Sequence, residues 1–384
     1  MLKYLPTKKD ELWKKFLIYN VKEEDLFFNK DKNIGELSDK QKELLEDLNG
    51  VVFIDGIFQE KLSMVENISI KEEKLSYQKG EDFFRKINHD NNQTYYKIKV
   101  SNTKTNILFL NTLLMENKFV APRILVEVNG LSEVNEIHNT RSLPGMISNV
   151  IDYNVNEDSD FKHNLHINSS SSYNIRDSKV NLYKNSKYNL THLNKIINLS
   201  RNNIIIDLYE GSDSKVNGIA MGTVLCTNSI YVCHNHIEKS SSNADINIML
   251  NHGGTVDYRC RANVNVAGVE AYQHTKGILE HILSKKDNKK KLSAGKIHAV
   301  PELFIFNNDV ACSHGLTIGE LDDEKIFYLM QRGISEKDAK ALLFKAFFKE
   351  MYMNIDENDV VFPLFENDVN EYVNFGNKKV DNES

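Results

Sequence analysis

Residues 256–266 read VDYRCRANVNV, and apolar and polar side chains alternate strictly along this stretch. Because successive side chains of a β-strand point to opposite faces, this segment predicts a strand with one buried face. The apolar parity is formed by Val256, Tyr258, Cys260, Ala262, Val264 and Val266.

The same pattern continues around this strand. Ile246, Ile248 and Leu250 alternate in the same way before a His-Gly-Gly turn at 252–254, and further short runs occur at 203–209 and 229–237. Asn, Ser, Gly and Asp separate them, and no helical pattern intervenes. Many short strands at close spacing predict a mainly β fold, either a β-solenoid or a β-sandwich. No exact repeat is visible.

The flanks of this strand-rich body have a different period. We expect an N-terminal α+β region over 1–94, with helices at 10–27 and 38–48, a strand core over 95–318, and a helical region over 319–384. Asp322 and Ser335 are candidate helix N-caps, and Gly333 is a candidate stop between the two helices.

The helix that begins after Ser335 is apolar on more than one side. A helix of this kind must bury both sides, either within its own domain or against a partner, and both alternatives stay open. One face carries Ala339, Leu342, Leu343, Ala346 and Phe347, and the surface is widened by Phe344, Phe348, Met351 and Tyr352.

Charge and composition exclude several classes of protein. The formal net charge of -6 argues against nucleic-acid binding, and the lysine-rich run at 285–291 is best explained as a solvated loop. No apolar run is long enough to cross a bilayer, so we expect no membrane insertion and a soluble, intracellular protein. The four cysteines should be reduced thiols.

Cys312 and His314 are candidate ligands at the end of a strand-like run. They share a parity with Val310, Leu316 and Ile318, so a strand would turn them toward one largely apolar side. A thiol and an imidazole there could bind a soft metal or sulfur. Alternatively, Cys312 fills the core and His314 belongs to a turn before Gly315.

The sequence Cys-His-Asn-His at 233–236 is a weaker candidate. Strand alternation sends Cys233 to one face and His234 and His236 to the other, so one metal cannot easily gather all three. Cys260 lies on the apolar parity of its strand and is predicted to be core.

Common catalytic signatures are absent from the sequence. Gly295-Lys296 lacks the upstream glycine of a phosphate-binding loop, and there is no serine nucleophile elbow or zinc-protease helix. A β-helix carbohydrate-active enzyme would need clustered carboxylates. From 212 to 273 the acidic residues are few and scattered: Asp213, Glu238, Asp245, Asp257 and Glu270.

One continuous region carries a specific run of residues: Pro301-Glu302-Leu303, Asn308-Asp309-Val310, Cys312-Ser313-His314-Gly315, Thr317, Gly319, Leu321-Asp322, Ile326-Phe327-Tyr328-Leu329 and Arg332-Gly333-Ile334. This run resembles a known family, the SufB/SufD proteins of iron-sulfur cluster assembly, and specifically its SufD branch. SufB-like proteins carry an upstream cysteine, whereas residues 293–298 here contain none. They also carry a carboxylate where this chain has Ser313-His314.

The resemblance implies a right-handed parallel β-helix and a non-catalytic scaffold that pairs with SufB and binds the ATPase SufC. It implies that His314, with Cys312 beside it, contributes to a transient iron-sulfur cluster at the SufB interface, and that ATP enters only through SufC. A homodimer could form without SufB. The location would be a bacterial cytoplasm, or a plastid-type organelle after loss of a transit peptide. Candidate SufC-docking residues are Phe327, Leu342, Leu343, Phe344, Phe347 and Phe348.

Three alternatives remain beside this one. They are a SufB-like scaffold, the β-helix carbohydrate-active enzyme, and a standalone metal-binding or sulfur-carrier protein that uses Cys312, His314 or the His234/His236 pair.

Overall fold

The computed structural model describes most of the chain. It covers residues 27–28, 34–280 and 295–381, apart from stretches at 47–48, 65–67, 75–84, 87, 90–93, 113–117, 141–144, 170–172, 197, 223–225 and 252–253. The helix expected at 10–27 and the lysine run at 285–291 therefore lie outside the described residues. The exception is Phe27, which belongs to the short strand β1 (Phe27–Phe28) rather than to a helix.

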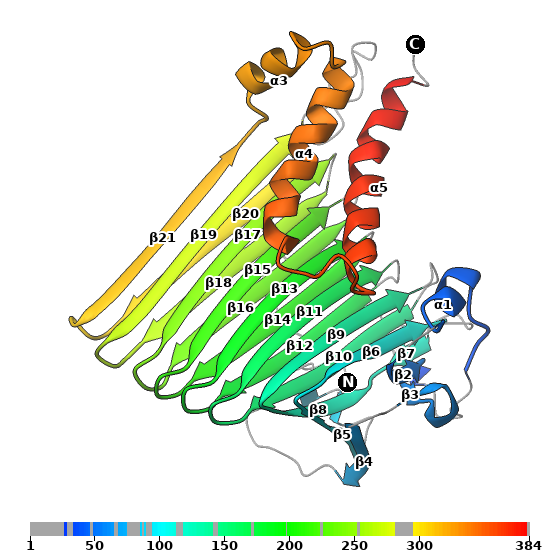
Figure 1. The fold of residues 1–384 in the computed structure, drawn as a ribbon, viewed down its shortest axis with the longest axis vertical. Coiled ribbons are helices and arrows are strands. Elements are labelled where there is room, and N and C mark those ends of the chain that lie inside the picture. The colour runs from blue at the N-terminus through cyan, green and yellow to red at the C-terminus, as the bar shows by residue number, and fades with distance from the viewer. Residues whose placement is uncertain are drawn as a thin grey trace.

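Two parallel sheets form the body of the molecule, and the chain passes from one to the other with each strand (Figure 1). Each strand pairs with the strand one coil earlier, which makes the fold a parallel β-solenoid. The first sheet, sheet A, contains β5 (Thr94–Ser101), β8 (Arg123–Asn129), β10 (Gly145–Val155), β12 (Tyr173–Leu182), β14 (Leu199–Leu208), β16 (Thr227–His236), β18 (Thr255–Val264) and β20 (Lys296–Ile305). Sheet B contains β2 (Gly50–Ile54), β6 (Lys104–Asn111), β9 (Leu131–Thr140), β11 (Asp160–Ser169), β13 (Lys187–Ile196), β15 (Asp213–Gly222), β17 (Ser241–Asn251), β19 (Val269–Glu280) and β21 (Val310–Gly319).

The coil length explains why no exact repeat is visible in the sequence. Side chains that face each other on neighbouring coils are separated by 26 to 29 residues, so the period drifts. The last coil breaks this range, because Arg261 and Glu302 are 41 residues apart. The lysine-rich run at 285–291, which is predicted to be a solvated loop, falls within this longer stretch of sequence. The solenoid alternative is confirmed, and the sandwich alternative is wrong.

The lumen between the sheets is the main core. The strict alternation at 256–266 predicted its inward face correctly, since Val256, Tyr258 and Cys260 are fully buried there. The outward parity of the same strand carries Arg259 and Arg261. This inward and outward division holds in each coil and allows lumen-facing residues to be assigned by register.

The turns that join sheet A to sheet B explain part of the Asn, Asp and Gly content. Asn102, Gly130, Asp158, Asn185 and Gly211 all adopt positive φ in successive coils, a conformation that these residue types tolerate best. The turns also bond to one another, as when Asn185 Nδ2 donates to Asp158 Oδ1 at 2.9 Å.

Antiparallel strands close the N-terminal end of the solenoid. β3 (Ile57–Phe58) pairs antiparallel with β2, and β4 (Ile68–Lys74) pairs antiparallel with β5. The short helix η5 (Glu60–Leu62) follows β3, while β7 (Lys118–Val120) pairs with β1 and β10 beside this end. Phe53 stacks on Phe109 and contacts the rings of Phe58 and Tyr96. This aromatic cluster fills the first coils.

Three helices follow the last strand. α3 (Asp323–Met330) begins at the Asp322 cap, and α4 (Glu336–Tyr352) begins at Ser335, whose hydroxyl accepts from the Asp338 amide at 3.1 Å. Gly333, between them, has a φ of +85°, so all three predicted helix boundaries are confirmed. The third helix, α5 (Phe362–Asp381), was not predicted as a separate element within the helical region 319–384.

α4 and α5 cover the outer face of sheet B (Figure 1). Phe348, Tyr352 and Phe365 pack there on Leu193 and Met221, in a second apolar layer outside the lumen. Farther toward the N-terminal end, the helix expected at 38–48 is the shorter α1 (Asp39–Glu43), which Ser38 caps. None of the described helices is long and apolar enough to cross a membrane.

Candidate functional site

The C-terminal end of the solenoid is formed by β20 and β21. β20 is the terminal strand of sheet A and β21 that of sheet B, so no described coil stacks on them. Their lumen-facing side chains are consequently only partly covered: Ile305 and Leu316 are each 43% exposed and Ile318 is 41% exposed. In an inner coil, residues at these positions are fully buried.

Cys312 and His314 lie on this open end, where their predicted shared parity is confirmed. Cys312 pairs in register with Ala271 and His314 with Gln273, and both partners are lumen-facing and buried. His314 itself is exposed, because it belongs to the last strand. The structure therefore presents an imidazole in the middle of an apolar strip.

Cys312 is more enclosed than its neighbour. It packs with Val310 and Leu303 against a small cluster formed by Ala262, Val264, Val269 and Ala271. Burial raises the pKa of the Cys312 thiol, although a backbone hydrogen bond at Ala271 opposes the shift. A raised pKa disfavours the thiolate that would bind metal or attack sulfur. The local geometry therefore favours the packing interpretation for Cys312.

Apolar side chains continue around the open end. Phe304 is 41% exposed and Phe306 is 73% exposed, just after the strand end. The Arg261 guanidinium lies 4.5 Å from the centre of the Phe304 ring and also bonds Glu302 at 2.9 Å. The rim is thus apolar, with one ordered ion pair beside it.

The Cys-His-Asn-His segment is divided between two faces of β16, as predicted. His234 and His236 point into the lumen, where they contact Ser214 and Ser242 hydroxyls respectively. Burial lowers the pKa of His234 to about 3 and that of His236 to about 4. Cys233 lies on the outer face, where Asn263 donates to its sulfur. The three side chains do not converge.

The other cysteines offer no ligand set. Cys260 is fully buried in the lumen, as predicted, and burial raises the pKa of its thiol to about 12. Cys226 is buried as well. Within the described residues, no three His, Cys, Asp or Glu side chains come together in a way that could hold a metal ion.

The predicted docking residues of the helical region differ in accessibility. Phe344 and Phe348 are buried against sheet B and offer no surface to a partner. Leu343 and Phe347 are half-buried, whereas Phe327 is 62% exposed and Leu342 is 48% exposed. Tyr328 and Met330 extend this accessible surface along α3. The accessible apolar surface of the helical region therefore centres on α3 and the exposed side of α4.

The lumen also contains a charged network that the sequence pattern did not predict. Arg176 donates two hydrogen bonds of 2.6 Å to the Glu136 carboxylate, which also accepts from Tyr153 and contacts His138 and His163. Burial opposes the ionised form of Glu136, but Arg176 and these hydrogen bonds lower its pKa well below the usual value. Burial lowers the pKa of both histidines. The network joins four strands across both sheets.

A comparison with protein-family models connects this geometry to known proteins. The model described as "SUF system FeS cluster assembly, SufBD core domain" matches residues 111–347, which is more than half of the chain. The match includes the open end and most of α4. The chain belongs to the SufBD family.

Individual SufBD relatives support the SufD branch. SufD of Escherichia coli is 48% identical over 63 residues, 16% of this chain and 15% of that protein. SufD of Plasmodium falciparum is 26% identical over 250 residues, 63% of this chain and 16% of that protein. A SufBD family protein of Synechocystis is 30% identical over 185 residues, 48% of this chain and 39% of that protein. The chain thus covers well under half the length of each of these relatives.

Proposed function

We propose that this chain is a SufD-type scaffold subunit of an iron-sulfur cluster assembly complex. In this proposal it pairs with a SufB-type partner through the open end of its solenoid and presents His314 to the nascent cluster there. The carrying observation is the incomplete burial of Leu316, Ile318 and Ile305 in a region that the SufBD core model matches.

The open end has the properties of a pairing surface. Edge strands expose unpaired backbone groups that readily accept another strand. Here the edges also carry exposed apolar side chains, which a partner could bury. An isolated molecule could use the same surface to form a homodimer when no SufB-type partner is present.

His314 suits a transient ligand. A neutral imidazole binds iron less tightly than a thiolate, and a scaffold must release its product. The cluster is therefore cargo of the complex rather than a resident cofactor of this chain. Cys312, two residues before His314 on the same face of β21, packs against the lumen cluster of Ala262, Val264, Val269 and Ala271.

In the same proposal, the SufC ATPase docks on α3 and the exposed side of α4. Phe327 and Leu342 would anchor it, with half-buried Leu343 and Phe347 completing the surface. The chain itself would hydrolyse no ATP. The site of action would be a bacterial cytoplasm or a plastid-type organelle.

Co-purification with SufB and SufC tests the pairing and the cluster role together. We expect the three proteins to form one complex, and we expect His314→Ala to leave that complex intact while lowering the yield of cluster on anaerobic reconstitution with iron and sulfide. Unchanged cluster yield would contradict the assigned role of His314. Failure of the wild-type chain to bind SufB would contradict the pairing.

A separate pair of variants tests the helical surface. Phe327→Asp combined with Leu342→Asp should abolish SufC binding and preserve SufB binding, because both side chains are exposed on helices outside β20 and β21. Leu131→Asp, at an exposed turn of the solenoid, is the matched control. SufC binding by the α3/α4 variant would move the docking surface elsewhere.

A further inference from the structure

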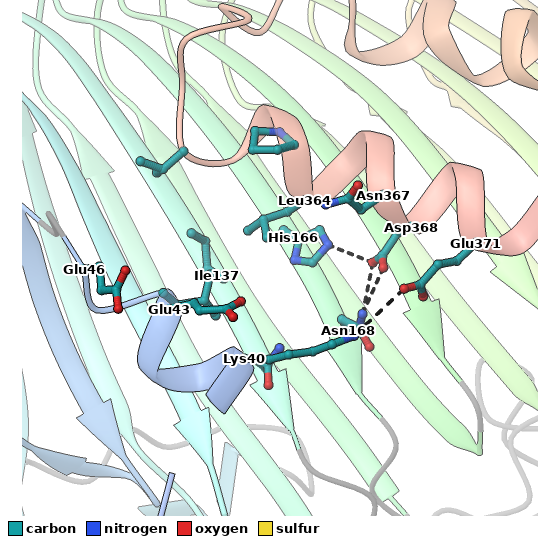
Figure 2. A pocket seen from close by; sticks show the side chains of 14 residues that line it. Lys40, Glu43, Glu46, Ile137, His166, Asn168, Leu364, Asn367, Asp368 and Glu371 are labelled. Atoms are coloured by element: carbon teal, nitrogen blue, oxygen red, sulfur yellow. Dashed lines mark hydrogen bonds and ion pairs between the residues drawn. The ribbon is translucent and has the colours of Figure 1, made fainter. Parts of the chain in front are cut away.

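A recess of about 380 Å³ lies between α1, α5 and the outer face of sheet B (Figure 2). It is far in sequence from both surfaces discussed above. Its lining includes apolar Leu44 from α1's C-terminal cap, Ile137 from β9 and Leu364 from α5. Three elements remote in sequence therefore contribute to one apolar lining.

One wall carries a buried histidine with an unused nitrogen. His166 Nε2 lies 2.8 Å from Asp368 Oδ2, and Lys195 also bonds this carboxylate at 2.8 Å. Since Nε2 faces this carboxylate, Nδ1 is the other nitrogen of the ring. Nδ1 is buried and has no hydrogen-bond partner in the described part of the chain. A buried polar atom of this kind calls for a hydrogen-bond partner.

The rim of the recess is negatively charged. Glu43 and Glu46 are exposed and form no ion pair with any described residue, and Glu371 lies on the opposite rim. Lys40 is the one basic side chain among the lining residues, 4.0 Å from Glu371. Carboxylates gathered around a recess create a negative electrostatic potential there, and this potential attracts cations. Together with the apolar lining, this negative rim fits lysine side chains that stand beside apolar groups.

The chain itself contains a matching segment. Residues 8–17, KKDELWKKFL, precede the described residues and place Lys14 and Lys15 between Trp13 and Phe16. Phe27 is held in β1 beside β7, and the roughly ten residues from Leu17 to Phe27 reach up to ~35 Å from that strand when extended. A tethered segment also has a high effective concentration at its site.

We propose that residues 8–17 dock in this recess, with Lys14 and Lys15 facing Glu43 and Glu46 and with Trp13 packing on the apolar lining beside His166. The docked segment would link the N-terminus to α5, the helix that Asp368 fastens to sheet B. This inference does not depend on the proposed function. It concerns a surface remote from the open solenoid end and from α3.

Trp13 is the single tryptophan of the chain, so its fluorescence reports this docking in the full-length protein without background. We expect blue-shifted emission and protection from acrylamide quenching in the wild type. Glu43→Lys combined with Glu46→Lys should red-shift the emission and raise the quenching constant several-fold. Adding Lys14→Glu and Lys15→Glu to that variant should restore protection by exchanging the charges.

Glu60→Lys with Glu157→Lys is the matched control, because it makes the same change in net charge at two exposed sites outside the recess lining. It should leave the fluorescence unchanged. An exposed Trp13 in the wild type would overturn the proposal. A Trp13 that stays protected in the Glu43→Lys, Glu46→Lys variant would also overturn it. Protection that appears only as the protein concentration rises would mean docking onto a second copy, and this too would overturn the proposal.

Discussion

The two ends of the solenoid are built in opposite ways. At the N-terminal end, antiparallel β3 and β4 cover the sheets and Phe53 lies fully buried in an aromatic cluster. The edge strand β4 carries Lys71, Glu72, Glu73 and Lys74, charges that discourage further pairing. At the C-terminal end, no described strand covers β20 and β21, and Phe306 and Leu316 are exposed. The described strands thus close one end of the solenoid and leave apolar side chains accessible at the other.

The largest expected effect is a difference between the two ends in how much a Phe→Ala substitution lowers the free energy of unfolding. Phe53→Ala should cost about 3–5 kcal/mol of unfolding free energy, because it leaves a cavity in a closed aromatic cluster. Phe306→Ala should change it by less than about 0.5 kcal/mol in the isolated protein, because the side chain is already in solvent. Urea denaturation measures both. Equal costs would mean that the C-terminal end is as closed as the N-terminal one.

The second effect concerns binding at the open end. Leu316→Asp with Ile318→Asp should weaken binding of a SufB-type partner by at least about 2 kcal/mol, roughly thirtyfold, because charges would enter a buried apolar contact. Titration calorimetry measures the affinity, and Leu131→Asp serves as the control. Retained affinity in the double variant would remove the open end from the interface.

A third effect probes the closed lumen between the two ends. The folded protein keeps His234 neutral, with a pKa of about 3, whereas the unfolded chain protonates it near pH 6.5. Stability therefore falls as the pH drops below 6.5, since the unfolded state binds the extra proton. His234→Leu should reduce that slope by about 1.4 kcal/mol per pH unit between pH 6 and 5.

The slope is read from urea unfolding at several pH values. His234→Leu can change the absolute stability for other reasons, but only the loss of a titrating group changes the slope in this direction. A slope identical to that of the wild type would show that water reaches this imidazole inside the lumen.

The smallest effect lies at the rim of the open end. Phe304→Ala removes the ring beneath the Arg261 guanidinium and should cost about 0.5–1 kcal/mol in the isolated protein. Combining it with Arg261→Ala forms a double-mutant cycle that isolates the contact. Strict additivity of the two costs would mean that the ring and the guanidinium do not interact energetically.

The sequence predicts the strands whose inward parity is wholly apolar. Residues 256–266 meet that condition, and both the strand and its buried face were identified. The inward faces of strands β9 and β13 are not wholly apolar, because Glu136 and His192 occupy lumen-facing positions there. Their strand character depends on hydrogen bonds to coils 26 to 29 residues away, which no local pattern records.

The sequence also predicted only part of the candidate site. Parity placed Cys312 and His314 on one face, and this was correct. Their different exposure could not be read from the sequence, because it depends on the absence of a further coil above β21. Likewise, the pattern of α4 indicated a broad apolar surface, but only packing on sheet B shows that Phe344 and Phe348 face inward while Leu342 faces solvent.

Hydrogen exchange of this chain, alone and with a SufB-type partner, tests the central claim most directly. Amides of β20 and β21 should gain protection in the complex, while those of β2, β3 and β4 should keep the protection they have in the free chain. Protection gained at the N-terminal strands, with none at β20 and β21, would contradict the assignment of the open end as the pairing surface.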